Sequence, residues 1–243
     1  MNSEIAIKTN NLTKSFDKRV VVDNLNIQIN KSEIFGFLGP NGSGKSTTIK
    51  MLCGLLSPNS GNATVNSYNI LNEGESIRKT IGYMSQKFSL YEDLTALQNL
   101  EFYSALYKVE KASERIVEVM ELANITKEKD KKTKFLSGGY KQRLALACAI
   151  VHKPQIIFLD EPTAGIDPVA RKEMWDLFFK LTKEGLTFFI TTHYMDEAEK
   201  CTKLGYIYNG KLIAYGATLE LANSKQGLEN LFVEISRTQN AIK

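Results

Sequence analysis

The sequence predicts an α/β fold with a mainly parallel core sheet, an N-terminal antiparallel β-subdomain and an inserted α-helical subdomain. The first observation is that short apolar runs alternate with longer stretches of helical periodicity. These runs are Ile34–Leu38, Ile81–Met84, Ile156–Leu159 and Phe188–Thr191. Runs without a polar face are typical of strands that are buried on both sides, as in a parallel sheet covered by helices.

The second observation is an alternating pattern near the N-terminus. Leu25, Ile27 and Ile29 alternate with asparagine and glutamine over residues 24–30, which predicts a half-exposed antiparallel strand. We expect Val20–Val22 to pair nearby. The N-terminal region is therefore predicted to be a β-rich subdomain.

The third observation is a helical stretch from Thr95 to Ile125 that contains no strand candidate. Thr95 is expected to cap a helix that ends near Tyr107, and a second helix follows with an apolar face. We predict a single domain over residues 1–243, in which a helical subdomain at about 88–150 is inserted into the α/β core. A later helix is expected over Pro168–Glu184, with Trp175 and Phe178 as packing residues.

The composition limits the classes of partner. The net charge is +4, from 31 Lys and Arg against 27 Asp and Glu, which gives no electrostatic case for a nucleic-acid partner. The densest basic run, Lys127–Lys134, is interpreted as a solvated loop, and a docking patch for an anionic partner is the alternative. Cys53, Cys148 and Cys201 show no ligand spacing and are expected to be core residues in a reducing compartment.

No apolar run approaches the roughly 18 residues that a membrane-spanning helix needs. The N-terminus also lacks the pattern of a signal peptide. We therefore expect a soluble intracellular protein, and any membrane process that it serves would need another chain to supply the span.

One segment matches the phosphate-binding pattern GxxxxGK[ST] at every fixed position. Its residues are Gly39, Pro40, Asn41, Gly42, Ser43, Gly44, Lys45 and Ser46. The segment follows an apolar strand and, with Thr47 after it, precedes a helical stretch that contains Ile49, Met51, Leu52 and Cys53, which is the context the motif requires. It therefore predicts a P-loop NTPase whose nucleotide-binding segment is residues 39–47.

The residue types in this segment suit phosphate chemistry. Glycines let the backbone curl and direct its N–H groups at phosphate oxygens, and the helix N-terminus adds partial positive charge. Lys45 would supply a full charge to the β- and γ-phosphates, and Ser46 would offer a hydroxyl to Mg²⁺. The alternative is a glycine-rich turn with an incidental lysine.

Two carboxylates follow the apolar strand Ile156–Leu159. A buried parallel strand delivers its C-terminal residues to the ligand crevice. Asp160 is expected to hold the Mg²⁺ shell, and Glu161 to act as the general base or to position the attacking water. The alternative is an acid pair at a helix N-terminus, which Pro162 disfavours because it prevents a helix from following directly.

The segment Leu136-Ser137-Gly138-Gly139-Tyr140 resembles the LSGGQ signature of the ATPases of ATP-binding-cassette (ABC) transporters, with tyrosine in place of glutamine. Other motifs of that family occur in order from about Ile5 to about Ile235. Gln86 resembles the glutamine of the Q-loop, Ala164–Asp167 resembles the D-loop, and His193 ends a strand as the switch histidine does.

The resemblance implies roles for further residues. Phe16 would stack on the adenine of ATP, with a core role as the alternative, and His193 would contact the γ-phosphate. Gln86 would join Ser46 and Asp160 around Mg²⁺, and Lys45, Gln86, Glu161 and His193 would form the catalytic set. Ser137, Gly138 and Gly139 would close on the ATP of a partner subunit, because a helix that opens Ser-Gly-Gly is an anion site.

The resemblance also implies partners. The active form would be a dimer of two ATPase subunits, as a homodimer or with a homologous cassette, bound to an integral membrane permease. The protein would then lie peripherally at the cytoplasmic face of the cell membrane. The segment with Phe88, Leu90 and Tyr91 would be its docking surface, with ordinary core and loop as the alternative.

The segments His193–Glu199 and Leu228–Glu234 resemble the ABC-2-type export group, and the chain ends without the regulatory domain of many sugar importers. We therefore expect an exporter. Two alternatives are a non-transport ABC ATPase of DNA repair, chromosome structure or translation, and a regulatory module that binds ATP without hydrolysing it. The first usually carries a long coiled coil, zinc cysteines or two cassettes, and the intact Glu161 and His193 disfavour the second.

Overall fold

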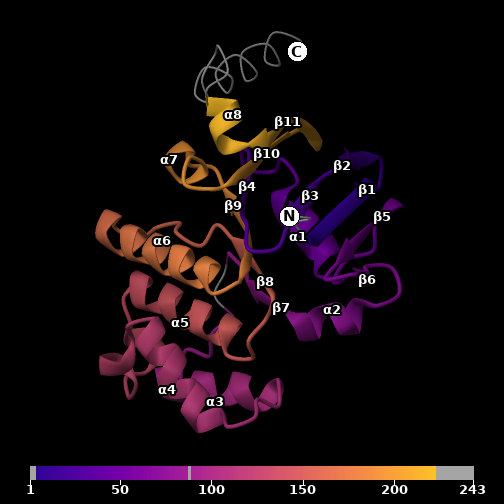
Figure 1. The fold of residues 1–243 in the computed structure, drawn as a ribbon. Helices are drawn as coiled ribbons and strands as arrows, with labels where there is room; N and C mark the ends of the chain where they lie inside the picture. Colours follow the sequence, from indigo (N-terminus) through magenta and orange to yellow (C-terminus); the bar gives the residue numbers. More distant parts are fainter. Residues whose placement is uncertain (1–3, 87–88, 223–243) are drawn as a thin grey trace.

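The computed structural model describes residues 4–86 and 89–222, and within them six strands form the central sheet in the order β11-β10-β4-β9-β8-β7 (Figure 1). The four predicted apolar strands are confirmed as β4 (Ile34–Leu38), β7 (Ile81–Met84), β8 (Ile156–Asp160) and β9 (Thr187–Thr192), and all their mutual pairings are parallel. β10 (Lys203–Tyr208) continues the parallel set beside β4, whereas β11 (Lys211–Ala217) is antiparallel at the edge.

The central strands are apolar throughout because their alternating side chains enter two different cores. From β4, Ile34 and Leu38 belong to one hydrophobic core, whereas Phe35 and Phe37 belong to the other. Every residue of β4, β8 and β9 is buried. A sheet that is covered on both faces produces this pattern, which confirms the predicted α/β class.

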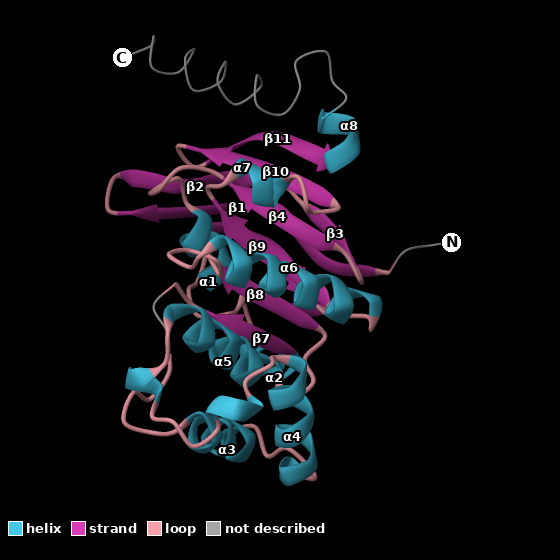
Figure 2. Cartoon of the chain, turned by 90° about the vertical axis from the view of Figure 1, so that its left-hand side faces the viewer, coloured by secondary structure: helices cyan, strands magenta, loops and turns pink. Residues whose placement is uncertain are grey.

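Different layers cover the two faces of the central sheet (Figure 2). The helices α5 (Gly138–Ile150) and α6 (Pro168–Lys183) pack on the core that contains Ile34, and Trp175 and Phe178 are buried there as predicted. The helix α1 (Lys45–Leu52) and the antiparallel sheet pack on the core that contains Phe35. The three cysteines are buried and free, also as predicted.

The antiparallel sheet has the order β2-β1-β5-β6, and β3 also pairs with β1. Its strands are β1 (Ile5–Phe16), β2 (Arg19–Leu25), β3 (Gln28–Asn30), β5 (Ser60–Val65) and β6 (Tyr68–Asn69). The prediction of one continuous strand over residues 24–30 is wrong. The Thr9 hydroxyl donates to the Leu25 carbonyl at 2.8 Å and accepts from the Ile27 N–H at 2.9 Å, so a side chain interrupts the strand between β2 and β3.

The helices of the predicted helical subdomain lie together at one end of the molecule (Figure 1). They are α3 (Ala96–Leu106), α4 (Ala112–Leu122) and α5, with short 3₁₀ turns at Thr126–Glu128 and Thr133–Phe135. Thr95 caps α3 as predicted and forms a capping box with Gln98. The subdomain boundary at about 88–150 stays a prediction.

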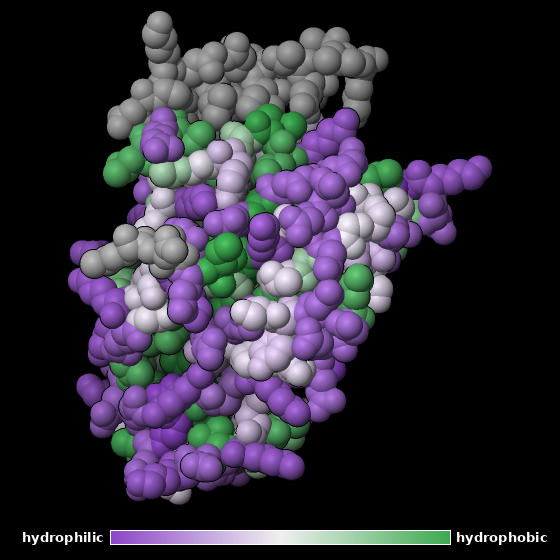
Figure 3. All heavy atoms as spheres, turned by 45° about the vertical axis from the view of Figure 1, so that its right-hand side comes forward, coloured by the Kyte–Doolittle hydropathy of each residue, from purple (hydrophilic) through white to green (hydrophobic). Residues whose placement is uncertain are grey.

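The remaining helices are α2 (Gly74–Thr80), α7 (Met195–Ala198) and α8 (Thr218–Ala222). None of the helices in the described part of the chain combines the length and the apolar character that crossing a membrane requires. On the face shown in Figure 3, hydrophilic side chains predominate and hydrophobic ones appear in small separate groups. Phe88 and the segment Leu228–Glu234 lie outside the described residues.

Candidate nucleotide site

The phosphate loop connects β4 to α1 and needs glycine at two positions with left-handed backbone. Gly42 has φ 77° and Gly44 has φ 113°. A Cβ atom on Gly44 would lie 2.5 Å from the Val21 carbonyl oxygen, so the loop packs against β2 too closely for any side chain there. The helix α1 begins at Lys45, directly after Gly44. The turn therefore presents its backbone and the N-terminus of α1 to the same place.

Lys45 is buried at the start of this helix. Its Nζ donates to the Gly39 carbonyl at 2.7 Å and to the Pro40 carbonyl at 3.2 Å. The same ammonium lies 3.3 Å from Glu161 Oε1, and the exposed fractions of the two side chains are 5% and 8%. The carboxylate and the two carbonyl oxygens compensate the buried ammonium charge and hold it in one position. The lysine of the loop and the carboxylate after β8 thus meet as the sequence predicts.

Asp160 is the last residue of β8 and is buried. Its Oδ1 accepts a hydrogen bond of 2.6 Å from Thr191 Oγ1, which lies directly opposite on β9. Thr191 is a site residue that the sequence analysis did not single out. The sequence shows that Thr191 lies near the end of an apolar strand. That it lies opposite Asp160 can be recognised only once the strand register is known.

Side chains from three separate segments of the chain lie around the carboxylate of Glu161. Its carboxylate lies near Lys45, accepts from Gln86 Nε2 at 3.2 Å and lies 3.4 Å from His193 Nδ1. Its φ is 52°, a conformation that costs a residue with a side chain roughly 1–3 kcal/mol. The backbone N–H of Glu161 donates to Thr191 Oγ1 at 3.0 Å, which helps to hold this conformation. All four predicted catalytic side chains are therefore together.

The donor set fits Mg²⁺ bound together with phosphate. Ser46, Asp160 and Gln86 can offer hydroxyl, carboxylate and amide oxygens, which are the ligands that Mg²⁺ prefers. In residues 4–86 and 89–222 no group of three or more His, Cys, Asp or Glu side chains could hold a metal alone. Mg²⁺ usually keeps few protein ligands and shares substrate phosphates, so this sparse set is suitable. The buried hydroxyl of Ser43, which has no hydrogen-bond partner within the described structure, lies in the same loop.

Phe16 ends β1 and is 46% exposed, so the alternative of a core role is wrong. The Lys14 ammonium lies 5.3 Å from its ring centroid, which is within range of a cation–π contact. Stacking on adenine stays a prediction. An exposed aromatic face is what such stacking requires.

The signature segment opens α5 as predicted. Ser137 is the N-cap, and its hydroxyl accepts from the Tyr140 N–H at 3.4 Å. A Cβ on Gly139 would lie 3.1 Å from Ala170 Cβ, and Gln142 Nε2 donates to the Ala164 carbonyl at 3.0 Å. The start of α5 thus packs against the segment that resembles the D-loop. Tyr140 is half-buried, and the Arg143 guanidinium lies 5.6 Å from its ring centroid.

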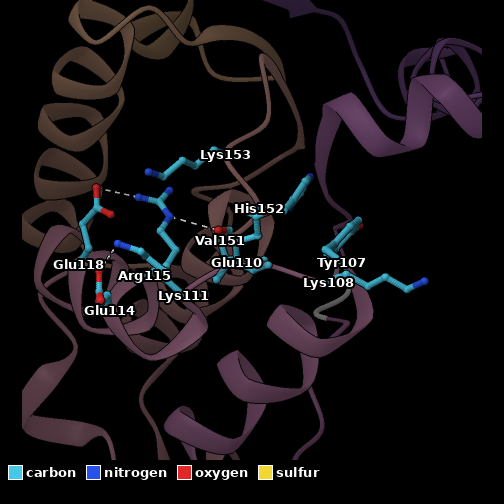
Figure 4. A pocket seen from close by; sticks show the side chains of 11 residues that line it. Tyr107, Lys108, Glu110, Lys111, Glu114, Arg115, Glu118, Val151, His152 and Lys153 are labelled. Atoms are coloured by element: carbon cyan, nitrogen blue, oxygen red, sulfur yellow. Dashed lines mark hydrogen bonds and ion pairs between the residues drawn. The ribbon is translucent and has the colours of Figure 1, made fainter.

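A separate cavity of about 450 Å³ lies between the ends of α3 and α5 and the start of α4 (Figure 4). His152 stacks on Tyr107 there with ring centroids 3.8 Å apart, and one ring nitrogen contacts the Ile81 carbonyl at 2.9 Å. Burial lowers the pKa of His152. This histidine is therefore a packing residue outside the site around Glu161.

Comparisons with known proteins agree with this arrangement. A family model described as ABC transporter matches residues 22–164. The chain is 44% identical over 241 residues to the probable multidrug ABC transporter ATP-binding protein YbhF of Escherichia coli (strain K12). That match covers 96% of this chain and 42% of YbhF, so the chain spans less than half of that relative.

Two further proteins extend the comparison. The linearmycin resistance ATP-binding protein LnrL of Bacillus subtilis (strain 168) is 38% identical over 224 residues, covering 91% of this chain and 72% of LnrL. The ATP-binding cassette MJ0796, solved as a dimer in a post-hydrolysis state with ADP and Pi, superimposes with a TM-score of 0.80 at 27% identity. That superposition covers 87% of this chain and 98% of the cassette.

Proposed function

This chain belongs to the ABC transporter family of ATP-binding proteins, and from that premise we propose that it binds and hydrolyses ATP to drive export across a membrane. The observation that carries the proposal is the convergence of Lys45, Gln86 and His193 on the Glu161 carboxylate. Four polar groups from four separate segments meet there, which is the arrangement that phosphoryl transfer to water needs.

In this proposal the phosphate loop holds ATP. The backbone N–H groups of residues 39–47 and the N-terminus of α1 face the phosphates, and Lys45 supplies a full positive charge. Ser46, Asp160 and Gln86 would hold Mg²⁺, which would offset negative charge on the phosphates when bound. Phe16 stacks on the adenine. Two further supports are the left-handed glycines of the loop and the exposed ring of Phe16.

Glu161 is proposed to orient the attacking water and to take its proton. The partners of its carboxylate restrict it to one orientation, and His193 beside it contacts the γ-phosphate. Transfer of the phosphoryl group to water breaks the bond to the ADP oxygen and forms inorganic phosphate. Positioning of this kind supplies most of the catalysis in phosphoryl transfer.

The test of this part is Mg²⁺-dependent phosphate release from ATP by the purified chain. Lys45→Ala should remove ATP binding and hydrolysis together, because its charge faces both phosphates and Glu161. Lys50→Ala is the matched control, since Lys50 is exposed on the same helix. Hydrolysis by Lys45→Ala at the native rate would contradict the proposed site.

We infer that the working form contains two such chains, or this chain and a homologous cassette. Ser137, Gly138 and Gly139 at the start of α5 then face the ATP held by the other subunit. The support is the capped Ser-Gly-Gly N-terminus in this chain and the dimeric form of the MJ0796 cassette. Light scattering of the Glu161→Gln variant with ATP should give twice the mass found without nucleotide.

We also propose an integral membrane permease as a partner, so that the chain lies peripherally at the cytoplasmic face of the membrane. Leu90 and Tyr91 belong to the predicted docking segment, and Tyr91 pairs with Phe102 of α3 at a centroid distance of 4.6 Å. Both rings are more than a third exposed, at 48% and 39%. The cavity of Figure 4 adjoins the C-terminal end of α3, the helix that carries Phe102.

Affinity purification from detergent-solubilised membranes of the protein's own cells tests this partnership. Recovery of a polytopic membrane protein at equal stoichiometry would support it, and Tyr91→Ala should reduce that recovery. Recovery of ribosomes or DNA instead would favour a non-transport ABC ATPase. Export is preferred because the relatives are named for multidrug transport and linearmycin resistance.

A further inference from the structure

Glu197 is a buried carboxylate that the proposed nucleotide site does not use. It lies on the short helix α7 and is 1% exposed. Its Oε2 accepts a hydrogen bond of 2.6 Å from Thr192 Oγ1, and its Oε1 accepts one from Thr163 Oγ1. Arg171 Nε lies 3.7 Å from the same Oε1. A buried carboxylate with these partners is fixed in one orientation.

The two threonines adjoin the two residues that are proposed to face the γ-phosphate. Thr192 directly precedes His193, and Thr163 follows Glu161 by two positions. The Thr192 hydroxyl also accepts from the Tyr194 N–H at 3.0 Å, so it shapes the turn that carries His193. A single carboxylate therefore joins the segment of the general base to the segment of the histidine.

Both of these segments are irregular and need such a connection. Residues 161–167 lie between β8 and α6, and residues 193–194 lie between β9 and α7. Glu161 keeps a left-handed backbone, with φ 52°, and its contact with His193 is 3.4 Å. A shift of either segment would separate this pair. Thr192 also accepts the Gly39 N–H at its carbonyl, at 3.3 Å, which ties the same turn to the phosphate loop.

We propose that Glu197 is a positioning residue for ATP hydrolysis, holding Glu161 and His193 in their relative places through Thr163 and Thr192. This inference rests on the proposed function of the Glu161 site. Packing alone does not explain the choice of residue, because an apolar side chain would fill the space without the cost of burying a charge. Both oxygens of the carboxylate accept a threonine hydroxyl, and buried hydrogen bonds of this kind restrict a region to one arrangement.

Arg171 extends the connection to α6. Its guanidinium lies 4.8 Å from the Tyr194 ring centroid, and its Nη1 lies 3.6 Å from Asp196 Oδ2. The helix α6 begins after Asp167, which ends the segment that resembles the D-loop. A change at the start of α6 would therefore reach the turn of His193 through Arg171 and Glu197.

The experiment compares steady-state ATP hydrolysis and ATP binding by the full chain and its variants. Glu197→Gln keeps the shape and loses the charge, and Thr192→Val removes one hydroxyl without changing the volume. We expect kcat to fall about tenfold or more in each variant, with KM for ATP within about twofold of the parent value. Thr192→Ser should restore most of kcat, and the double variant should lose no more than Glu197→Gln alone.

Thr182→Val is the matched control, because its hydroxyl bonds to the Phe178 carbonyl within α6, outside this network. If the parent hydrolyses ATP and Glu197→Gln equals it, the positioning role is overturned and the proposed function stands. If kcat, ATP binding and thermal stability fall together and Thr192→Ser rescues none of them, Glu197 is a structural residue only. If the parent itself hydrolyses no ATP, the proposed function fails and the inference fails with it.

Discussion

The Lys45 ammonium and the Glu161 carboxylate lie 3.3 Å apart although their strands are not neighbours. Lys45 begins the helix after β4, Glu161 follows β8, and β9 lies between these strands in the sheet. The pair therefore spans the carboxyl end of β9, where Thr191 and Thr192 lie. Ligand crevices of open α/β sheets form at this edge, because parallel strands deliver their last residues there.

This pair should be visible in the stability of the protein without nucleotide. Lys45→Met leaves the buried Glu161 carboxylate without its cation, and we expect a loss of about 3–5 kcal/mol in the free energy of unfolding. The double variant Lys45→Met, Glu161→Gln should recover most of that loss, because no charge remains unpaired. Urea denaturation measures both values, and additive losses would contradict the coupling.

The hydrogen bond between Thr191 and Asp160 is expected to hold the carboxylate for Mg²⁺. Thr191→Val should cost about 1–2 kcal/mol in unfolding free energy, because Asp160 loses its hydrogen-bond donor and the Glu161 N–H keeps only the Thr191 carbonyl. The variant should also need more Mg²⁺ for half-maximal ATP hydrolysis. Thr191→Ser keeps the hydroxyl and is the control. An unchanged Mg²⁺ requirement in Thr191→Val would contradict the role of this bond.

Arg115 stabilises the end of α5 from the neighbouring helix. Its Nη2 donates to the Ile150 carbonyl at 2.7 Å. Its Nε donates to the Val151 carbonyl at 3.1 Å, and its Nη1 pairs with Glu118 (Figure 4). Arg115→Met should lower the free energy of unfolding by about 1–3 kcal/mol, since two carbonyls at a helix C-terminus lose a cationic donor. Arg115→Lys should recover only part, because an ammonium cannot reproduce the planar fork. Full recovery in urea denaturation would contradict this reading.

The main strands could be predicted from the sequence because their burial on both faces leaves a local mark. Ile156–Leu159 has no polar residue, so its place in the sheet interior follows from its composition. β1 could not be predicted in this way, because Lys8, Asn10 and Asn11 interrupt any apolar run or regular alternation of apolar and polar residues. Its identity depends on pairing with β2, β3 and β5, which are distant parts of the chain.

The same limit applies to the site. The phosphate-loop pattern predicts that Lys45 faces phosphate, and the apolar strand before Asp160 predicts the same for Glu161. Each of these patterns lies within one short segment of the sequence. The contact between Gln86 and Glu161 joins residues 75 positions apart, and only the assembled fold shows which of its atoms meet. In the sequence, Glu197 is distinguished only as part of the segment His193–Glu199, which resembles the ABC-2-type export group. Its burial between Thr163 and Thr192 depends on how α7 packs on β9, which no local pattern encodes.

The cysteine thiols should resist alkylation over the usual pH range. Burial raises the pKa of Cys53, Cys148 and Cys201, and the negative charge of Asp160 adds to the effect on Cys53. A raised thiol pKa means that the reactive thiolate is scarcer in the folded chain than in the unfolded chain at the same pH. Iodoacetamide at pH 8 should therefore modify all three only in urea. Rapid labelling of the native protein at pH 8 would contradict their burial.

Glu161 is proposed to serve hydrolysis and not ATP binding. The measurement is phosphate release at saturating ATP and Mg²⁺ by the parent chain and by Glu161→Gln, with ATP affinity determined for both. We predict that Glu161→Gln lowers the rate at least about 100-fold, as loss of a general base does, and keeps ATP affinity within a few-fold. Glu184→Gln, at the exposed end of α6, should match the parent. Hydrolysis by Glu161→Gln at the parent rate would contradict the role of Glu161 as the general base.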